Sequence, residues 1–343
     1  MSKRILKVSA SLLLAASVLM AGCSAEATET EKKKKKKDKK EKETEETTLD
    51  TTEETGEETS SEMTTEETTE ETTMPFAPDT SLYEAYITGD AKLVFHAEND
   101  LGQYMCLSEV LNDGESYTCK ELEAKAVTID NYSTMKVDGD PEYTYIDCGE
   151  DGIPELLETL SISPTTGGET FILSMIIKEI DGELHLCYAR DSWSRCYAAI
   201  AENGTVVVDG SGGAFTHYVE EEFVDADGQY HYYYGCCQEY CPTQLFVRIS
   251  PDEYDYVDFS DLDVDEFMVR EYWFELEYTE RQSFYTYGFY DDVTRSYIAD
   301  DSQFAADNPY RMKFVPFDLT VYTNTEVQDI LNQRAKEIGF PGN

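Results

Sequence analysis

Short turn-forming pairs of residues divide the middle of the chain into regular segments. Asp-Gly occurs at 113–114, 138–139, 151–152, 181–182, 209–210 and 227–228, and Asn-Gly occurs at 203–204. Such pairs tolerate the positive φ angles that two-residue hairpin turns require. Segments rich in β-branched and aromatic residues flank several of them. The chain between residues 142 and 249 is therefore predicted to fold as consecutive antiparallel hairpins.

Nine segments in this region have the composition of strands. They are 143–147, 156–163, 175–180, 183–188, 197–202, 205–208, 215–224, 229–234 and 244–249. Together they predict an antiparallel meander of eight or nine strands. Residues 250–322 mix acidic and aromatic side chains without a clear period, so no element is assigned there.

Helices are expected near both ends of this region. Thr118 and Glu121 have the spacing of a capping box for a helix over residues 119–130. Residues 79–87 are a weaker helical segment. A C-terminal helix is expected with Thr325 as its N-cap and Gly339 as its stop. We interpret residues 79–343 as one acidic α+β domain that is mainly antiparallel sheet.

The segment that precedes this domain has no secondary-structure period. Residues 32–37 are an unbroken lysine run, and the chain after Lys42 consists almost entirely of Thr and Glu. Too little apolar surface is present to offset the entropy of an ordered chain. Residues 24–78 are therefore predicted to be a disordered tether, which like charges along the Glu-rich part would extend.

The first residues have the pattern of a targeting signal. A basic start (Lys3, Arg4, Lys7) is followed by uncharged residues 8–22, a run too short to span a membrane. The segment 19–23, Leu-Met-Ala-Gly-Cys, resembles the lipobox of bacterial lipoproteins. The resemblance implies removal of a signal peptide, residues 1–22, and acylation of the Cys23 thiol. Residues 23–78 would then be the lipidated cysteine and its tether, and the domain would lie on the extracellular face of the cell membrane.

The charge of residues 79–343 restricts the partners of the domain. This part holds 15 Lys and Arg against 53 Asp and Glu, and it contains all 25 tyrosines of the chain. Nucleic acid is excluded as a partner, because binding to its backbone needs a cationic surface. The partners expected are the membrane, through the lipid anchor, and a cation or a glycan as ligand.

One acidic loop has the residue types of a cation site. Residues 147–156, Asp-Cys-Gly-Glu-Asp-Gly-Ile-Pro-Glu-Leu, resemble the D-x-D-x-D-G-x-x-[DE] calcium loops of EF-hands and of many secreted bacterial proteins. Calcium takes six to eight oxygen ligands, which acids at alternate positions supply. The predicted ligands are the carboxylates of Asp147, Asp151, Glu155 and Glu158 and the backbone oxygen of Ile153.

The same loop also fits a simpler interpretation. The third position of the calcium pattern is Gly149 instead of an acid, and a predicted strand precedes the loop where an EF-hand has a helix. A tight acidic turn with Gly152 in the left-handed region is therefore the alternative to calcium binding.

A second resemblance involves the strand and loop at residues 143–156. The pattern Y-x-D-x-G-x-D-G-x-P-E-L, together with the glycine-rich segment 210–214, resembles uncharacterised secreted lipoproteins of Gram-positive bacteria. In that group the pattern opens a β-rich domain with no assigned activity. The resemblance therefore implies the location and a β-rich fold, and it implies no reaction.

Eight cysteines follow Cys23 in the chain, and three interpretations of them stay open. An even number outside the cell permits disulfides. Cys236, Cys237 and Cys241 with His231 would supply a zinc set, although the spacing matches no common zinc module. Buried inert thiols are the third interpretation.

Two functions from different classes fit the sequence. The first is a non-catalytic binding module, in which tyrosines serve as stacking platforms for a ligand. The tyrosines considered are Tyr230, Tyr232, Tyr233, Tyr234, Tyr285, Tyr287 and Tyr290. The second is an extracellular hydrolase that uses a pair of carboxyl groups. The sequence contains no G-x-S-x-G, H-E-x-x-H or P-loop pattern that would assign another chemistry.

Overall fold

The computed structural model describes residues 78–129, 134–250, 253–277, 280–298 and 300–342. These residues belong to one compact unit, Thr73–Asn343. The predicted signal peptide, Cys23 and all of the predicted tether except Pro78 lie outside the described residues. Within the described part of the chain, no helix is long and apolar enough to cross a membrane.

The first sheet has seven strands and one parallel pair. Its order is β2 (Ser116–Tyr117), β1 (Leu93–Val94), β7 (Glu183–Ser192), β6 (Phe171–Ile180), β5 (Glu155–Pro164) and β3 (Met135–Val137), and β4 (Glu142–Ile146) also pairs with β5. The parallel pair is β1 with β7. All other pairs of named strands among the described residues are antiparallel.

The second sheet also has seven strands, and a separate two-stranded hairpin follows β11 in the chain. The order of the second sheet is β16 (Ser296–Ile298), β15 (Phe284–Asp291), β14 (Phe267–Trp273), β11 (Tyr230–Tyr240), β10 (Thr216–Val224), β9 (Thr205–Ser211) and β8 (Cys196–Ile200). The separate hairpin consists of β12 (Gln244–Ser250) and β13 (Glu253–Asp258). The described residues are thus β-rich, with antiparallel sheets and few helices.

The prediction of one continuous meander over residues 142–249 was wrong, although strands β4 to β12 lie where it expected strands. The series of antiparallel hairpins breaks between β7 and β8, because other residues already pair with the edge of β7 that β8 would have joined. Leu93 of β1 pairs with Leu184, and further along the same edge Leu101 N donates to Ala189 O at 2.8 Å. The chain therefore turns at residues 193–196 and starts a new sheet with β8.

Four α-helices and several short 3₁₀ helices complete the described fold. The α-helices are α2 (Ser81–Thr88), α3 (Cys119–Ala126), α4 (Pro309–Met312) and α5 (Asn324–Ile338). The 3₁₀ helices are η3 (Ala97–Asn99), η4 (Leu107–Glu109), η5 (Cys148–Glu150), η6 (Asp301–Phe304) and η7 (Val315–Phe317). In α3, Thr118 and Glu121 form the predicted capping box in both directions.

Helix α5 begins two residues earlier than the sequence predicted. Its N-cap is Thr323 instead of Thr325. The Thr323 Oγ1 atom accepts a hydrogen bond from Glu326 N at 3.1 Å, and the Glu326 carboxylate accepts one from Thr323 N at 2.8 Å. This reciprocal pair satisfies two donors that a helix start otherwise leaves free. The helix ends at Gly339, as predicted, with φ of 70°.

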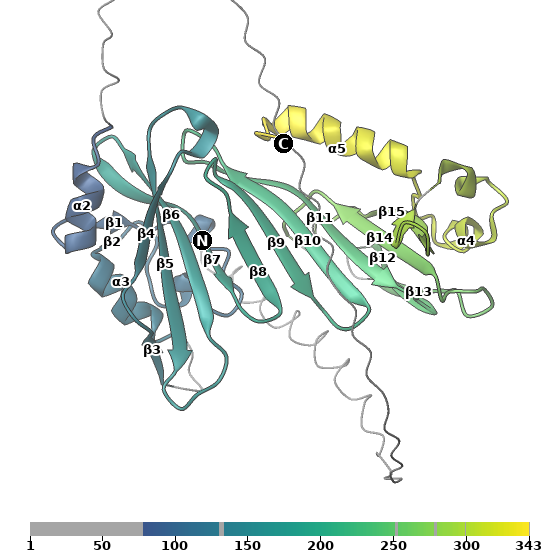
Figure 1. Ribbon diagram of the computed structural model, residues 1–343, viewed down its shortest axis with the longest axis horizontal. Coiled ribbons are helices and arrows are strands. Elements are labelled where there is room, and N and C mark those ends of the chain that lie inside the picture. Colours follow the sequence, from purple (N-terminus) through teal and green to yellow (C-terminus); the bar gives the residue numbers. More distant parts are fainter. Residues whose placement is uncertain (1–77, 130–133, 251–252, 278–279, 299, 343) are drawn as a thin grey trace, which may run out of the picture. The chain divides into compact units, whose positions relative to one another are not determined.

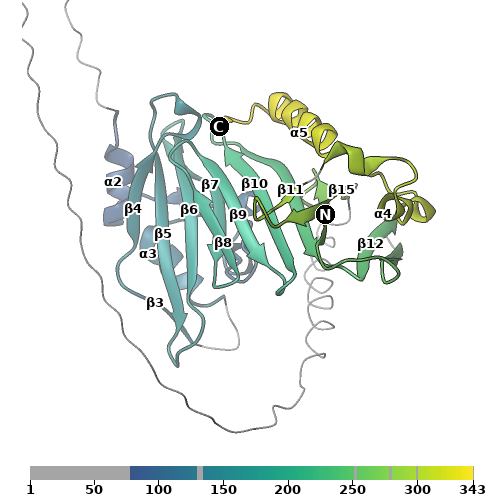
Figure 2. The ribbon, with the colours of Figure 1, turned by 45° about the vertical axis from the view of Figure 1, so that its right-hand side comes forward.

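Helices α2 and α3 lie on one face of the first sheet (Figures 1 and 2). Tyr83 and Tyr86 of α2 and Leu122 of α3 pack against Leu156 and Leu160 of β5 in one buried cluster. A second cluster joins the two sheets, since it contains Tyr188 of the first and Val208 of the second. The central strands of the first sheet, β5 to β7, are therefore largely buried on both faces.

The region that the sequence left unassigned contains strands without alternating burial. In β15, residues 284–288 are all buried. Tyr285 and Tyr287 belong to an aromatic cluster with Phe267 and Phe314. A strand buried on both faces gives an apolar run instead of the period of two that marks a half-exposed strand.

Candidate functional site

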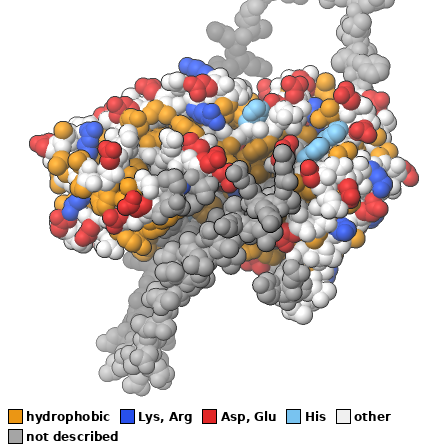
Figure 3. Space-filling model, turned by 180° about the vertical axis from the view of Figure 1, so that it is seen from behind, with side chains coloured by type: hydrophobic (Ala, Val, Ile, Leu, Met, Phe, Trp, Pro, Cys, Tyr) orange, Lys and Arg blue, Asp and Glu red, His pale blue; other side chains and the backbone are white. Residues whose placement is uncertain are grey.

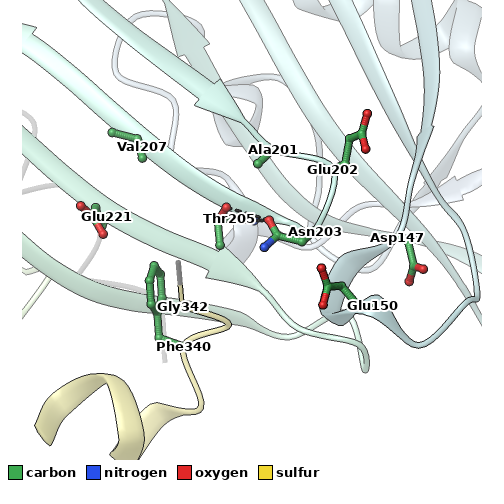
Figure 4. Close-up of a pocket in the computed structure, with 10 residues that line it drawn as sticks. All are labelled: Asp147, Glu150, Ala201, Glu202, Asn203, Thr205, Val207, Glu221, Phe340 and Gly342. Atoms are coloured by element: carbon green, nitrogen blue, oxygen red, sulfur yellow. Dashed lines mark hydrogen bonds between the residues drawn. The ribbon is translucent and has the colours of Figure 1, made fainter. Parts of the chain in front are cut away.

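A pocket of about 640 Å³ opens beside the loop that follows β4 (Figure 4). Four parts of the fold form it: the loop at residues 147–150, the β8–β9 turn, the strands β9 and β10, and the segment after α5. The lining residues are Asp147, Glu150, Ala201, Glu202, Asn203, Thr205, Val207, Glu221, Phe340 and Gly342.

Backbone hydrogen bonds fix the loop of the first sheet to the turn of the second. Asp147 N donates to Glu202 O at 2.8 Å, and Gly149 N donates to Asn203 O at 3.1 Å. The side chain of Asn203 stabilises its own turn, because its Oδ1 atom accepts a hydrogen bond from Thr205 Oγ1 at 2.8 Å. Two sides of the pocket thus hold each other in place.

The loop places Glu150 at the pocket through an uncommon backbone conformation. Gly149 has φ of 76°, and a Cβ atom there would lie 2.7 Å from Ala226 N, so this position requires glycine. Glu150 itself has φ of 57°. A left-handed conformation costs a residue with a Cβ atom about 1–2 kcal/mol, and such strain is concentrated at functional sites.

The polar groups of the pocket are predominantly acidic. Four carboxylates line it (Asp147, Glu150, Glu202, Glu221), and no lysine or arginine is among its described lining residues. Asp147 accepts hydrogen bonds from Gly152 N at 3.1 Å, and Glu221 accepts one from Tyr234 Oη at 2.8 Å. Glu150 and Glu202 are exposed. Like charges that face one cavity are stabilised by a cation between them.

An apolar wall completes the pocket. Phe340 follows α5, and its ring packs on Tyr233 with a centroid distance of 4.4 Å and on Phe223 at 5.6 Å. Val207 lines the same cavity and is 42% exposed. An aromatic face near carboxylates suits an organic cation, since the ring attracts the charge and the apolar wall covers the carbon skeleton.

The acidic surface extends beyond this pocket. On the face shown in Figure 3, carboxylate side chains are spread widely and Lys and Arg side chains are fewer. A ligand must therefore be recognised by the shape and apolar wall of the pocket as well as by charge.

The five predicted calcium ligands are not brought together by the structure. Asp147 lines the pocket, while Asp151 accepts a hydrogen bond from Ile153 N at 2.8 Å at an exposed turn. Glu155 and Glu158 are buried on β5. Three positions apart on a strand, these two side chains lie on opposite faces of the sheet, so one ion cannot contact both.

Glu155 and Glu158 instead bind partners within the protein. Glu155 forms a buried ion pair with Lys178 and accepts a hydrogen bond from Cys148 N at 2.6 Å. Calcium binding by the remaining part of the loop, Asp147, Asp151 and the backbone oxygen of Ile153, stays a prediction. Across the described residues, no group of three or more His, Cys, Asp or Glu side chains is arranged to hold a metal ion.

Glu158 lies among tyrosines, and no ion pair involves its carboxylate among the described residues. Tyr86 Oη donates to its carboxylate at 2.9 Å, and Tyr143 Oη does so at 3.4 Å. Burial is the largest cause that raises the pKa of Glu158, to about 7, because the charged form loses its hydration. The Glu158 side chain is fully buried, so a ligand in solvent does not contact it, whereas it still exchanges a proton with solvent.

The other predicted site residues are distributed through the fold. Cys236 and Cys237 are adjacent on β11 and therefore face opposite sides of the sheet. His231 Nε2 lies 2.7 Å from Asp225 Oδ2. All eight described cysteines are free thiols. No described zinc set or disulfide therefore involves Cys236, Cys237 or Cys241.

The predicted tyrosine platforms are mostly interior. Tyr232, Tyr233, Tyr285 and Tyr287 are at most 9% exposed. Exposed aromatic rings occur instead on the β12–β13 hairpin, where Phe246 and Tyr254 stack at a centroid distance of 5.2 Å. The sequence missed this pair because the region after residue 249 was left unassigned.

Comparisons with known proteins assign no function to this chain. No family model, no curated protein and no solved structure matches this chain. The chemistry of the pocket must therefore be inferred from its residues.

Proposed function

We propose that this protein is a lipid-anchored extracellular binding module of α+β class, whose pocket takes a small organic cation. The observation that carries the proposal is the lining of the pocket: four carboxylates and no described cation. The volume of about 640 Å³ suits a small molecule, because ligand pockets measure about 300–1,000 Å³. Non-catalytic binding is the simpler function for carboxylates that share one open cavity.

Lipid attachment is the second part of the proposal, and it rests on the lipobox resemblance at residues 19–23. Cys23→Ala is expected to abolish incorporation of a fatty-acid probe, because alanine has no thiol to acylate. The measurement is metabolic labelling in a bacterial host followed by gel fluorescence. Cys106→Ala, which removes a half-buried thiol of the domain, is the matched control and should leave labelling unchanged. Label that persists in the Cys23→Ala protein would refute acylation at this residue.

Neutralising the pocket is expected to weaken binding of an organic cation. The probe is spermidine, titrated by calorimetry into the whole chain in detergent. Glu150→Gln with Glu202→Gln should reduce affinity about tenfold, since an exposed charge contact contributes about 0.2–1 kcal/mol and 1.4 kcal/mol is a factor of ten. Neither carboxylate accepts a hydrogen bond within the described part of the chain, so the fold should tolerate both changes.

A charge-matched variant separates pocket binding from attraction by the acidic surface. Asp292→Asn with Asp307→Asn removes two exposed charges outside the pocket and should leave spermidine affinity within twofold. Equal losses in both double variants would show that spermidine binds the surface diffusely and would refute the pocket. Hydrolysis of a chromogenic glycoside by the parent, lost in the pocket variant, would favour the alternative of a carboxylate-pair hydrolase.

A further inference from the structure

Two histidines from distant parts of the chain meet where β1 pairs with β7 in the first sheet, outside the acidic pocket. The parallel pairing of β1 with β7 aligns Val94 with His185, and His96 follows two residues later. The Nε2 atom of His96 lies 2.9 Å from the Nδ1 atom of His185, with the ring planes 11° apart. Both side chains are half-buried, so solvent and ions reach them.

We propose that His96 and His185 form a two-imidazole site for a divalent transition metal, Cu²⁺ or Ni²⁺ in preference to Zn²⁺. This inference goes beyond the proposed function and is independent of the pocket. Imidazole nitrogen is a preferred ligand of these metals, whereas calcium and magnesium take oxygen. The backbone pairing already brings the two nitrogens together, so little conformational freedom is lost on binding.

The distance between the two nitrogens supports the choice of metal. With metal–nitrogen bonds of about 2.0–2.1 Å, adjacent ligands lie about 2.9 Å apart in a square plane and about 3.4 Å apart in a tetrahedron. The two nitrogens are 2.9 Å apart as partners of a ring-to-ring hydrogen bond, which a bound ion would replace. The square plane typical of Cu²⁺ and Ni²⁺ is the geometry that requires the least change in this separation. With the ring centroids 5.2 Å apart, the two nitrogens face each other head-on, so each ring would turn by about 45° for both lone pairs to meet one ion in a square plane.

Each ring is able to present a bare nitrogen. A neutral imidazole carries its proton on one of its two nitrogens, so the proton between the rings moves to the opposite nitrogen of the same ring when the metal binds. Water would fill the remaining positions, and the Glu183 carboxylate lies on the same side of β7 two residues away.

The test is a calorimetric titration of the whole chain in detergent with Ni²⁺, Zn²⁺ and Mg²⁺. The parent should bind Ni²⁺ more tightly than Zn²⁺. His96→Gln and His185→Gln should each weaken Ni²⁺ binding at least tenfold, because even outer partners of a metal site contribute about 10–100-fold. His217→Gln, a half-buried histidine on another strand, is the matched control and should bind as the parent does.

Electron paramagnetic resonance of bound Cu²⁺ gives a second readout. The parent spectrum should show two coordinated imidazole nitrogens, and each single variant should show one. The titration with Mg²⁺ measures diffuse binding of cations to the acidic surface. The affinity for Mg²⁺ should be the same in the parent and in all three histidine variants. Circular dichroism checks that each variant is folded. Unchanged Ni²⁺ affinity in either folded variant, or a loss equal to that of His217→Gln, would overturn the proposal.

Discussion

Replacing Arg190 by methionine is expected to lower the free energy of unfolding by about 3–5 kcal/mol. Arg190 of β7 is buried, and its guanidinium pairs with Glu220 at 2.7 Å and with Glu222 at 3.1 Å on β10. These contacts join the two sheets. Methionine fills much of the same volume, but it leaves the fully buried Glu222 carboxylate without a cation, and an uncompensated buried charge is the main cost.

Denaturant unfolding of the parent and of Arg190→Met measures this difference. Burial already raises the pKa of Glu222 in the parent, and the charge of Arg190 opposes that shift, so the variant should raise this pKa further above its value in the unfolded state. The variant should therefore lose stability as pH rises, and its deficit should be larger at pH 8 than at pH 5. Arg195→Met, at an exposed position, should change stability by less than about 0.5 kcal/mol. A deficit below about 1 kcal/mol at pH 8 would contradict the importance of this network.

The second large effect is expected at Glu158. The pKa of Glu158 is about 7 in the folded state, and its ordinary value is 4.5. Between pH 4.5 and pH 7, the carboxyl group therefore holds its proton in the folded state and has released it in the unfolded state. The contribution of this group to stability is thus fully present below pH 4.5 and is lost as pH rises through 7. The total loss is about 3 kcal/mol, at 1.36 kcal/mol per pKa unit.

Glu158→Gln should remove this pH dependence. The amide oxygen still accepts the hydrogen bond from Tyr86, and no charge is buried at high pH. The variant is therefore expected to be more stable than the parent at pH 8 and nearly equal to it at pH 4.5. Glu142→Gln, an exposed neighbour on β4, is the control. If stability falls between pH 5 and 8 with the same slope in Glu158→Gln as in the parent, Glu158 does not carry the proton.

Local sequence signals predicted the elements better than their assembly. Asp-Gly and Asn-Gly pairs, and the capping box of Thr118 and Glu121, act within a few residues, so the turns and α3 were accessible from the sequence. The division into two sheets was not, because it depends on residues 93–101 reaching the edge of β7. The sequence of residues 142–249 contains no pattern that shows that residues 93–101 pair with the edge of β7.

The candidate site shows the same limit. The acidic loop was recognised, and Asp147 does line the pocket, but Glu202, Glu221 and Phe340 come from three other segments that only the fold unites. The calcium pattern was counted as a loop through Glu155 and Glu158, whereas β5 begins at Glu155. From that residue onward side chains alternate between faces, which separates carboxylates that a loop would have gathered.

The parallel pairing of β1 with β7 also has a consequence for the order of folding. Most strand pairs here join neighbours in the chain and close short loops, whereas Leu93 pairs with Leu184 across five intervening strands and the helix α3. Closing so long a loop is entropically costly and slow, and non-local pairs dominate folding times. We expect the hairpins of β5 to β7 to form first, with their apolar face open until α2, β1 and α3 dock. The newly made chain would be most vulnerable to aggregation in that interval.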